Sequence, residues 1–150
     1  MAIPFPVHIP FLVGIGAELQ RFADGEAEIT LDVQEPHTNS FGVAHGGLQM
    51  TLLDVAMAHA VRSRNLDQPD GGPGLVTVEM KTSFMRPAQG RIRVIGQVIH
   101  ATASLAFTEG RVIDQHDRVC AHATGTFKFL RALPTADRDV KPLARHAGSD

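Results

Sequence analysis

The sequence predicts an α+β domain in which one curved antiparallel sheet wraps around one long central helix. The first observation behind this prediction is the segment 48–61, which is apolar nearly all round and follows two glycines. Such a run is typical of a buried helix rather than a surface helix. The second observation is the order of the other segments, with a hairpin before this helix and a series of strands after it. This order indicates an α+β plan with a single core.

The N-terminal half contains the hairpin, a polar loop and the helix. Residues 16–33 alternate on both sides of an Asp-Gly pair, which is a strong turn signal. Residues 34–44 form the polar loop, which carries Asn39. The helix is expected over 46–64, where a segment rich in Gly and Pro follows it. The apolar residues 1–16 are expected to form a short helix or an extended arm that covers the sheet.

Four strands are expected after the helix. They cover residues 75–85, 91–102, 104–114 and 118–129. Alternation in the first of them places Val76, Val78, Met80 and Phe84 on one face and Thr77, Glu79 and Lys81 on the other. The single domain is expected over 1–133. From Pro134 the chain is polar and contains proline, so 134–150 is expected to be a flexible C-terminal tail.

Composition restricts the classes of function. The chain has 150 residues, enough for one domain with a sizeable core, and a formal net charge of −2. A net charge this close to zero predicts no general attraction to nucleic acid or to an anionic membrane. The single cysteine, Cys120, excludes an internal disulfide framework and fits a reducing cytosol. Three prolines and the lack of a basic residue before Arg21 disfavour a signal peptide, so a cytoplasmic location is expected.

Asp54 and two glycines point to chemistry at the helix. Aspartate is a poor helix former and is almost never fully buried unless it is paired. Burial should raise its basicity, which suits a general base or a nucleophile. Gly46 and Gly47 leave the unpaired N–H groups of the first helical turn open to an oxygen that gains negative charge. A structural alternative stays open for Asp54, because a buried carboxylate can also simply bond a hydroxyl or a backbone amide.

At these residues the sequence resembles a known family. Asn39, the segment GVAHGG at 42–47 and the segment TLLD at 51–54 are similar to the hotdog-fold acyl-CoA thioesterases of the PaaI type. The resemblance runs from about Gly16 to Phe129 and includes two looser matches in the strands. It implies a hotdog fold and hydrolysis of an acyl-CoA thioester to free acid and CoA. It also implies a homodimer or a dimer of dimers, which is a homotetramer, and no cofactor, because CoA is part of the substrate.

The resemblance also implies roles within the site. The Gly46 N–H would bind the thioester oxygen as it becomes an oxyanion, and Asp54 would activate water or attack directly. Asn39 would orient the carbonyl or the attacking water. Thr77 matches a position where the family carries a hydroxyl that supports the carboxylate, although an ordinary strand threonine is an equally good interpretation. His45 would brace the loop rather than act as the acid.

Two other functions and a metal site are alternatives to hydrolysis. A hotdog domain can bind acyl-CoA without cleaving it, but such a module has no need of a buried acid. A hotdog enoyl-CoA hydratase would use a His–Asp or His–Glu pair in different sequence surroundings, which this sequence lacks. Eight histidines are present, yet none lies at the spacing of a familiar metal site, so no metal is expected. A pocket for an aryl or medium alkyl chain could be lined by Met50, Met57, Phe84 or Met85.

The length of the helix predicts that each active site is shared between two chains. At 1.5 Å per residue, Gly46 and Asp54 lie about 12 Å apart along the helix axis. An oxygen on the Gly46 amide and a water next to its carbon cannot readily both reach Asp54 of the same chain. A second helix, antiparallel across a two-fold axis, could place its Asp54 opposite the first Gly46.

Overall fold

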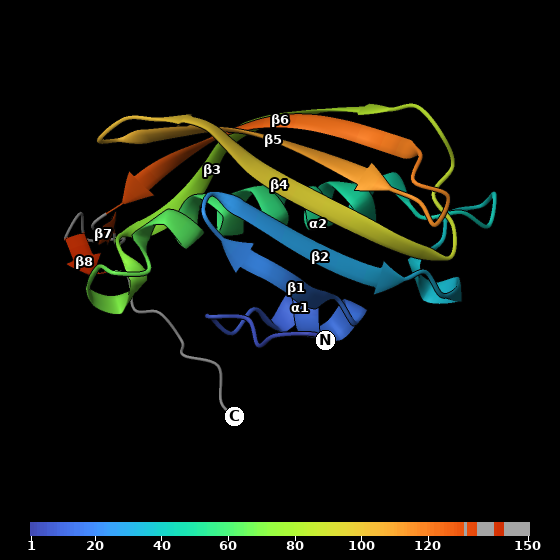
Figure 1. Cartoon of the computed structure of the whole chain (residues 1–150), viewed down its shortest axis with the longest axis horizontal. Helices are drawn as coiled ribbons and strands as arrows, with labels where there is room; N and C mark the ends of the chain where they lie inside the picture. Colours follow the sequence, from blue (N-terminus) through green and yellow to red (C-terminus); the bar gives the residue numbers. More distant parts are fainter. Residues whose placement is uncertain (131, 135–139, 143–150) are drawn as a thin grey trace.

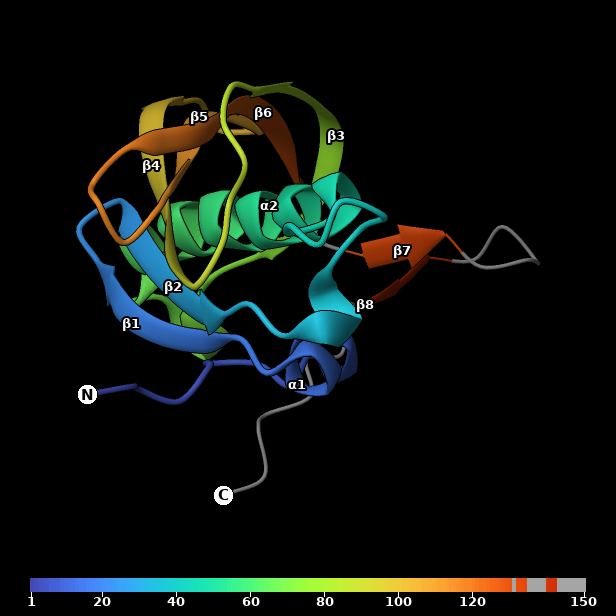
Figure 2. The same cartoon turned by 90° about the vertical axis from the view of Figure 1, so that its right-hand side faces the viewer.

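The computed structural model describes residues 1–130, 132–134 and 140–142 of the chain. Six strands form one antiparallel sheet in the order β1-β2-β4-β5-β6-β3, and α2 lies along its concave side (Figure 1, Figure 2). The predicted curved sheet around one long helix is therefore confirmed. The elements are β1 (Glu18–Ala23), β2 (Glu26–Asp32), α2 (Gly46–Arg62), β3 (Gly74–Phe84), β4 (Arg91–Ala101), β5 (Leu105–Ile113) and β6 (Val119–Leu130).

The first part of the chain forms the predicted hairpin and arm. Asp24 and Gly25 join β1 to β2 with φ values of 55° and 81°, which suit the tight turn that an Asp-Gly pair favours. Before β1, α1 spans Pro10–Ile15, and the Ile3 N–H donates to the Leu19 carbonyl at 2.8 Å. The expected short helix and the expected extended arm are thus both present, next to the sheet edge formed by β1.

α2 packs so closely against the sheet that its position along the strands is fixed. At Gly96 on β4, a Cβ atom would lie only 2.4 Å from the backbone of Ala56. Met57 is fully buried under β5 and β6, where Gly110 and Gly125 face it. These close contacts with β4, β5 and β6 fix the rotation of α2 about its axis. The face of α2 that carries Asp54 therefore lies toward β3.

β3 is an edge strand with a bulge. It pairs with β6, and the register shifts between Thr77 and Glu79, so Val78 is an extra residue. The hydroxyl of Thr77 meets Asp54 on α2, whereas the carboxylate of Glu79 meets Thr126 on the outer face of the sheet. The predicted alternation, which placed Thr77 on the face of Glu79, is therefore wrong. The reason is that the bulge interrupts the two-residue period of the strand.

Short helices and a small hairpin complete the described chain. The short helices are η1 (Glu35–His37), η2 (Ser63–Asn65) and η3 (Pro69–Gly71). Because η2 follows directly, α2 ends at Arg62, two residues earlier than expected. The strands β7 (Ala132–Pro134) and β8 (Val140–Pro142) pair with each other. The rest of the predicted tail at 134–150 lies outside the described residues.

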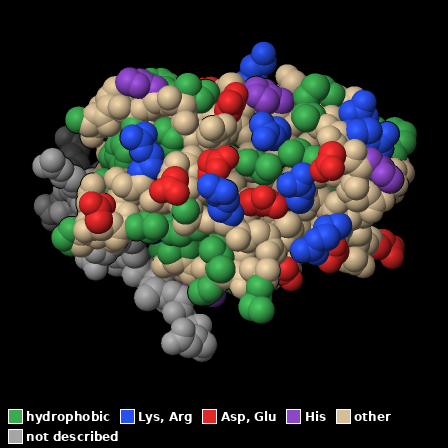
Figure 3. Space-filling model, viewed as in Figure 1, with side chains coloured by type: hydrophobic (Ala, Val, Ile, Leu, Met, Phe, Trp, Pro, Cys, Tyr) green, Lys and Arg blue, Asp and Glu red, His purple; other side chains and the backbone are tan. Residues whose placement is uncertain are grey.

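The surface seen in Figure 3 mixes basic and acidic side chains rather than collecting charges of one sign. Ion pairs join neighbouring strands and turns, including Arg21 with Glu26 at 3.0 Å and Arg93 with Asp117 at 2.8 Å. Such mixing produces no large field of a single sign over this face. None of the described helices is long and apolar enough to cross a membrane.

Candidate active site

The N-terminus of α2 leaves the Gly46 N–H open. His45 is the N-cap residue: its Nδ1 accepts the Gly47 N–H at 2.9 Å, and its carbonyl accepts the Gln49 N–H at 3.1 Å. The His45 N–H itself donates to the His37 carbonyl at 2.9 Å. The Gly46 N–H has no hydrogen-bond partner among the described residues, and the partial positive charge of the helix end acts at the same place. It is therefore available to an oxygen that gains negative charge.

The two glycines at this helix end have different surroundings. A Cβ at Gly47 would lie 3.1 Å from Nδ1 of His45, so a side chain there would push the capping ring aside. A Cβ at Gly46 would meet the ring of Phe84 at 3.4 Å, which is close to an ordinary van der Waals contact. Position 46 can therefore accept a methyl group more easily than a branched side chain, and the ring of Phe84 borders the open N–H.

Asp54 is partly buried on the side of α2 that faces β3. Its Oδ1 accepts a hydrogen bond from the Thr77 hydroxyl at 2.6 Å. Burial raises the pKa of Asp54 above its ordinary value, and the Thr77 hydrogen bond acts in the opposite direction. No hydrogen bond to Oδ2 is found among the described residues, so this oxygen can accept a proton or attack a carbon atom.

The side chain of Asn39 is part of its own loop. Its Oδ1 accepts the Phe41 N–H at 2.9 Å and the Val43 N–H at 3.4 Å, and the Asn39 N–H donates to the Val43 carbonyl at 2.9 Å. This arrangement is the local turn that asparagine favours. Within the described chain, Nδ2 makes no hydrogen bond, so any contact of Asn39 with a substrate would use this donor.

Within one chain, the structure does not bring Gly46 and Asp54 together. They are the first and ninth residues of α2, which separates them by about 12 Å along the axis. Asp54 and Thr77 form one group on the β3 side, which we call the acid group. His45 and Gly46, with the Asn39 loop, form a second group at the helix N-terminus, which we call the amide group.

The residues expected around the acyl chain are only partly accessible. Met57 is fully buried in the core, so its prediction as a pocket residue is wrong. Phe84 and Met85 are 50% and 58% exposed, and Met50 is partly buried. The sequence could not show this difference, because Met50 and Met57 are both apolar residues of one apolar helix and only the sheet distinguishes their faces.

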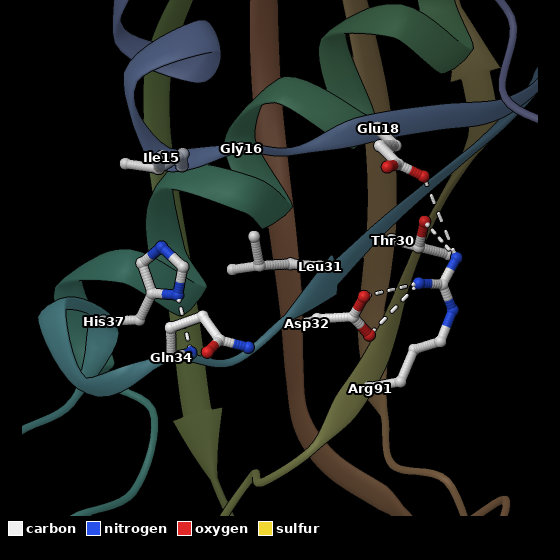
Figure 4. A pocket seen from close by; sticks show the side chains of 9 residues that line it. All are labelled: Ile15, Gly16, Glu18, Thr30, Leu31, Asp32, Gln34, His37 and Arg91. Atoms are coloured by element: carbon white, nitrogen blue, oxygen red, sulfur yellow. Dashed lines mark hydrogen bonds and ion pairs between the residues drawn. The ribbon is translucent and has the colours of Figure 1, made fainter.

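A cavity of about 190 Å³ lies between α1, the hairpin of β1 and β2, and η1, whose His37 carbonyl accepts the N–H of His45 in the amide group (Figure 4). Its charged side chains bond one another: the Arg91 guanidinium donates to both Asp32 oxygens at 3.0 and 3.1 Å. His37 borders the cavity and bonds the Gln34 N–H through Nδ1. No predicted catalytic residue lines this cavity. In the described part of the chain, no three His, Cys, Asp or Glu side chains are grouped so that they could hold a metal ion.

The sheet, the helix and the two groups define a protein of the hotdog class. The chain belongs to the thioesterase superfamily, because the family model of that description matches residues 41–121, more than half of the chain. The matched range contains both Gly46 and Asp54, and it begins two residues after Asn39.

Known proteins of this kind are similar over most of the domain. Human acyl-coenzyme A thioesterase 13 is 36% identical over 88 residues, which cover 57% of this chain and 59% of that protein. The solved structure of conserved protein PA5202 from Pseudomonas aeruginosa is 31% identical, with a TM-score of 0.75 and coverage of 83% and 97%. A mutant of the phenylacetic acid degradation protein PaaI from Thermus thermophilus is 26% identical, with a TM-score of 0.71 and coverage of 81% and 100%. These likenesses confirm the predicted hotdog fold and the resemblance to the PaaI type.

Proposed function

We propose that the protein hydrolyses an acyl-CoA thioester to a free acid and CoA. The observation that carries this proposal is the presence on α2 of an open Gly46 N–H and of the Asp54 carboxylate, whose pKa is raised by burial. Hydrolysis of a thioester needs a donor where negative charge develops and a base or nucleophile near the carbonyl carbon. The likeness to human acyl-coenzyme A thioesterase 13 supports the choice of substrate class.

In the proposed reaction, the Gly46 N–H donates to the thioester oxygen, which becomes an oxyanion as the carbon is attacked. Asp54 either takes a proton from the attacking water or attacks the carbon itself, giving a mixed anhydride that water cleaves. In both routes the C–S bond breaks, and the CoA sulfur leaves as a thiolate that takes up a proton. The Thr77 hydroxyl holds Oδ1 and leaves Oδ2 as the reacting oxygen. Asn39 can assist with Nδ2 only.

We also propose that a second copy of the chain completes each site. β3 is eleven residues long and lies at one edge of the sheet, and no other described strand pairs with its free side. Val78 and Phe84 on this strand are 56% and 50% exposed. A long edge with exposed apolar side chains is a template for pairing with another chain. Pairing of two β3 strands about a two-fold axis would set the α2 helices antiparallel, with Asp54 of one copy opposite Gly46 of the other.

A hydrolysis screen tests the proposed reaction. The purified protein is incubated with a panel of acyl-CoAs that differ in acyl group, and the freed thiol is detected. At least one acyl-CoA is expected to be turned over, and Asp54→Asn is the matched control because it keeps the size of the side chain and removes the base. Acyl-CoA binding without thiol release from any member of the panel would contradict hydrolysis and identify a non-catalytic acyl-CoA-binding module.

Mixed dimers test the shared site. Asp54→Asn protein and Gly46→Val protein are unfolded and refolded together, so that one site of each mixed dimer carries both defects and the other carries neither. Random pairing gives about half mixed dimers with one intact site of two, so roughly a quarter of wild-type activity should return. Sites built within single chains would each keep one defect, and verified mixed dimers without activity would refute the shared arrangement.

The structure offers less support for a hydratase. Such an enzyme would need a histidine beside a carboxylate at the α2 groups. Among the described residues, the histidine within ion-pair distance of a carboxylate is His122, whose Nε2 lies 3.5 Å from Glu109. This pair joins β5 and β6 on the outer face of the sheet, away from α2.

A further inference from the structure

Gln49 is a buried polar side chain that the proposed reaction does not use. It lies one turn after Gly46 and is only 4% exposed. Its Nε2 donates to the Ala44 carbonyl at 3.1 Å, whereas its Oε1 is buried and has no partner among the described residues. A buried carbonyl oxygen without a partner is destabilising, so the unpartnered Oε1 is a cost, whereas the Nε2 bond satisfies the buried Ala44 carbonyl. The role of the glutamine at this position therefore depends on its bond to the Ala44 carbonyl rather than on packing alone.

The hydrogen bond of Gln49 acts on the peptide group that precedes the open N–H. The carbonyl of the Ala44–His45 peptide accepts from Gln49, and its N–H donates to the His37 carbonyl at 2.9 Å. This peptide plane is thus held on both sides. The next peptide, His45–Gly46, carries the open N–H, and its own carbonyl accepts the Gln49 N–H at 3.1 Å. The side chain and the main chain of Gln49 thus hold two consecutive peptide planes, and the side-chain bond fixes the first plane, to which the plane of the Gly46 N–H is joined.

No other described side chain takes over this contact. The Asn39 oxygen is occupied by the Phe41 and Val43 N–H groups, earlier in the same loop. The His45 ring caps the Gly47 N–H and does not bond the Ala44 carbonyl. Gln49 is thus the described side chain of α2 that bonds Ala44, the residue before the N-cap residue His45.

We propose that Gln49 is a positioning residue: by holding the Ala44 carbonyl, it keeps the Gly46 N–H aimed at the place where the oxyanion forms. This inference rests on the proposed function, since it assigns a task to Gln49 in the same site. Gln49 touches neither substrate nor reacting atoms and acts through the peptide groups on either side of His45.

Gln49→Met tests the proposal, because methionine has nearly the same length and shape but no donor. Misplacement of an oxyanion donor lowers the rate of the chemical step more than it lowers binding, so kcat should fall about tenfold while KM changes by less than about twofold. The melting temperature should fall only modestly, because the variant removes the buried unpartnered Oε1 but leaves the Ala44 carbonyl without its partner. Gln20→Met is the matched control: Gln20 bonds Thr30 and Glu18 on the hairpin, far from α2's start, and its kinetics should be unchanged.

Gln49→Glu provides a second, pH-dependent test. A protonated carboxyl group can donate to the Ala44 carbonyl, whereas an ionised one cannot, and burial raises the pKa of the introduced carboxyl. The ratio of variant to wild-type kcat should therefore rise as the pH is lowered. Asp54 and the neighbouring histidines are common to both proteins, so this ratio isolates the introduced group. A ratio that is flat with pH would contradict the proposed bond.

The Gly46 amide signal in an NMR spectrum separates this inference from the proposed function. In Gln49→Met, the Gly46 amide should shift while the Gly25 amide does not. If Gln49→Met shifts the Gly46 amide but the wild-type protein hydrolyses no acyl-CoA, the proposed function is refuted. The catalytic purpose of the positioning is then refuted as well. Wild-type kcat and an unmoved Gly46 amide in Gln49→Met would overturn the inference alone. A parallel change of kcat and KM would also overturn it, because that outcome indicates a general disturbance of the site rather than a misplaced oxyanion donor.

Discussion

Asp54 and His59 are titratable side chains on the same helix, five residues apart, and burial shifts both toward their uncharged forms. Their surroundings differ. Asp54 faces the sheet edge, is partly exposed and bonds one hydroxyl through one oxygen. His59 is 2% exposed and lies against the rings of Phe5 and Phe22, with centroid distances of 5.4 and 5.7 Å.

The chemical state of His59 follows from its contacts. Its Nδ1 lies 2.8 Å from the Val55 carbonyl, so the neutral ring carries its proton there. Its Nε2 is buried without a partner among the described residues, and burial lowers the pKa of His59 to about 4. A perturbed pKa therefore does not by itself mark a catalytic group. What distinguishes Asp54 is its partial exposure and a second carboxylate oxygen with no hydrogen bond among the described residues.

The largest effect is expected from Asp54→Asn. If Asp54 is the base or nucleophile, turnover should fall by roughly 10²–10⁴, while the fold and acyl-CoA binding persist. Because burial raises the pKa of Asp54 in the folded protein, its ionised form opposes folding as the pH rises through that pKa. The variant should therefore be at least as stable as the wild type at neutral pH. Steady-state kinetics and thermal melting check this, and a collapse of stability would favour a structural aspartate.

Thr77→Val should have the next largest effect. Valine keeps the shape of threonine but cannot donate to Asp54, so the pKa of that carboxyl should rise further. The acid limb of the kcat/KM profile should move to higher pH, with activity at neutral pH lower by about tenfold and recovered in part at alkaline pH. Thr77→Ser keeps the hydroxyl and is the control. Identical pH profiles for all three proteins would show that Thr77 is an ordinary strand residue.

Asn39 calls for a pair of substitutions with a smaller expected effect. Asn39→Asp keeps the acceptor that holds the Phe41 and Val43 N–H groups but removes the Nδ2 donor, whereas Asn39→Ala removes both. If Nδ2 contacts the substrate, both variants should lose a few-fold in kcat, less than Asp54→Asn does. Wild-type kinetics in Asn39→Asp would show that the asparagine only forms the turn.

His59→Leu should leave hydrolysis unchanged and alter only the response of stability to acid. The pKa of His59 is about 4 in the folded protein against 6.5 otherwise, so the unfolded chain binds more protons between these values. The wild type should lose about 2 kcal/mol through this group between pH 7 and pH 5. Denaturant unfolding at both pH values should show a smaller loss in the variant. A reduced kcat would place His59 in the site and break the comparison with Asp54.

Much of the fold can be predicted from the sequence, because helices, strands and turns each have a characteristic pattern of apolar and polar residues. The apolar run predicted α2, and an Asp-Gly pair predicted the first hairpin turn, whose two positive φ values the structure confirms. The bulge at Val78 was not predictable, because Val76 through Met80 alternates as a regular strand would. A bulge depends on how β3 meets β6, which is a property of two strands rather than of one.

The candidate site was predicted in its members and less well in their contacts. Thr77 bonds Asp54 and His45 caps the helix next to Gly46, whereas the oxygen of Asn39 is committed to its own loop. The roles of these residues in hydrolysis stay predictions. Gln49 is not among the predicted site residues, although a polar residue inside an apolar helix is itself an indication of a specific contact. Its importance depends on a contact with the Ala44 carbonyl, and no spacing in the sequence reveals that contact.

Because Gly96 lies so close to Ala56, a substitution at this position in the sheet would change the position of Asp54 on α2. A methyl group at Gly96 would overlap helix backbone, which cannot rotate away as a side chain can. The helix would have to lift or slide, and the carboxylate of Asp54 would leave its 2.6 Å partner on β3. Random mutagenesis scored on activity should therefore recover inactivating changes at Gly96 on β4, in the middle of the sheet and beyond the reach of any substrate atom.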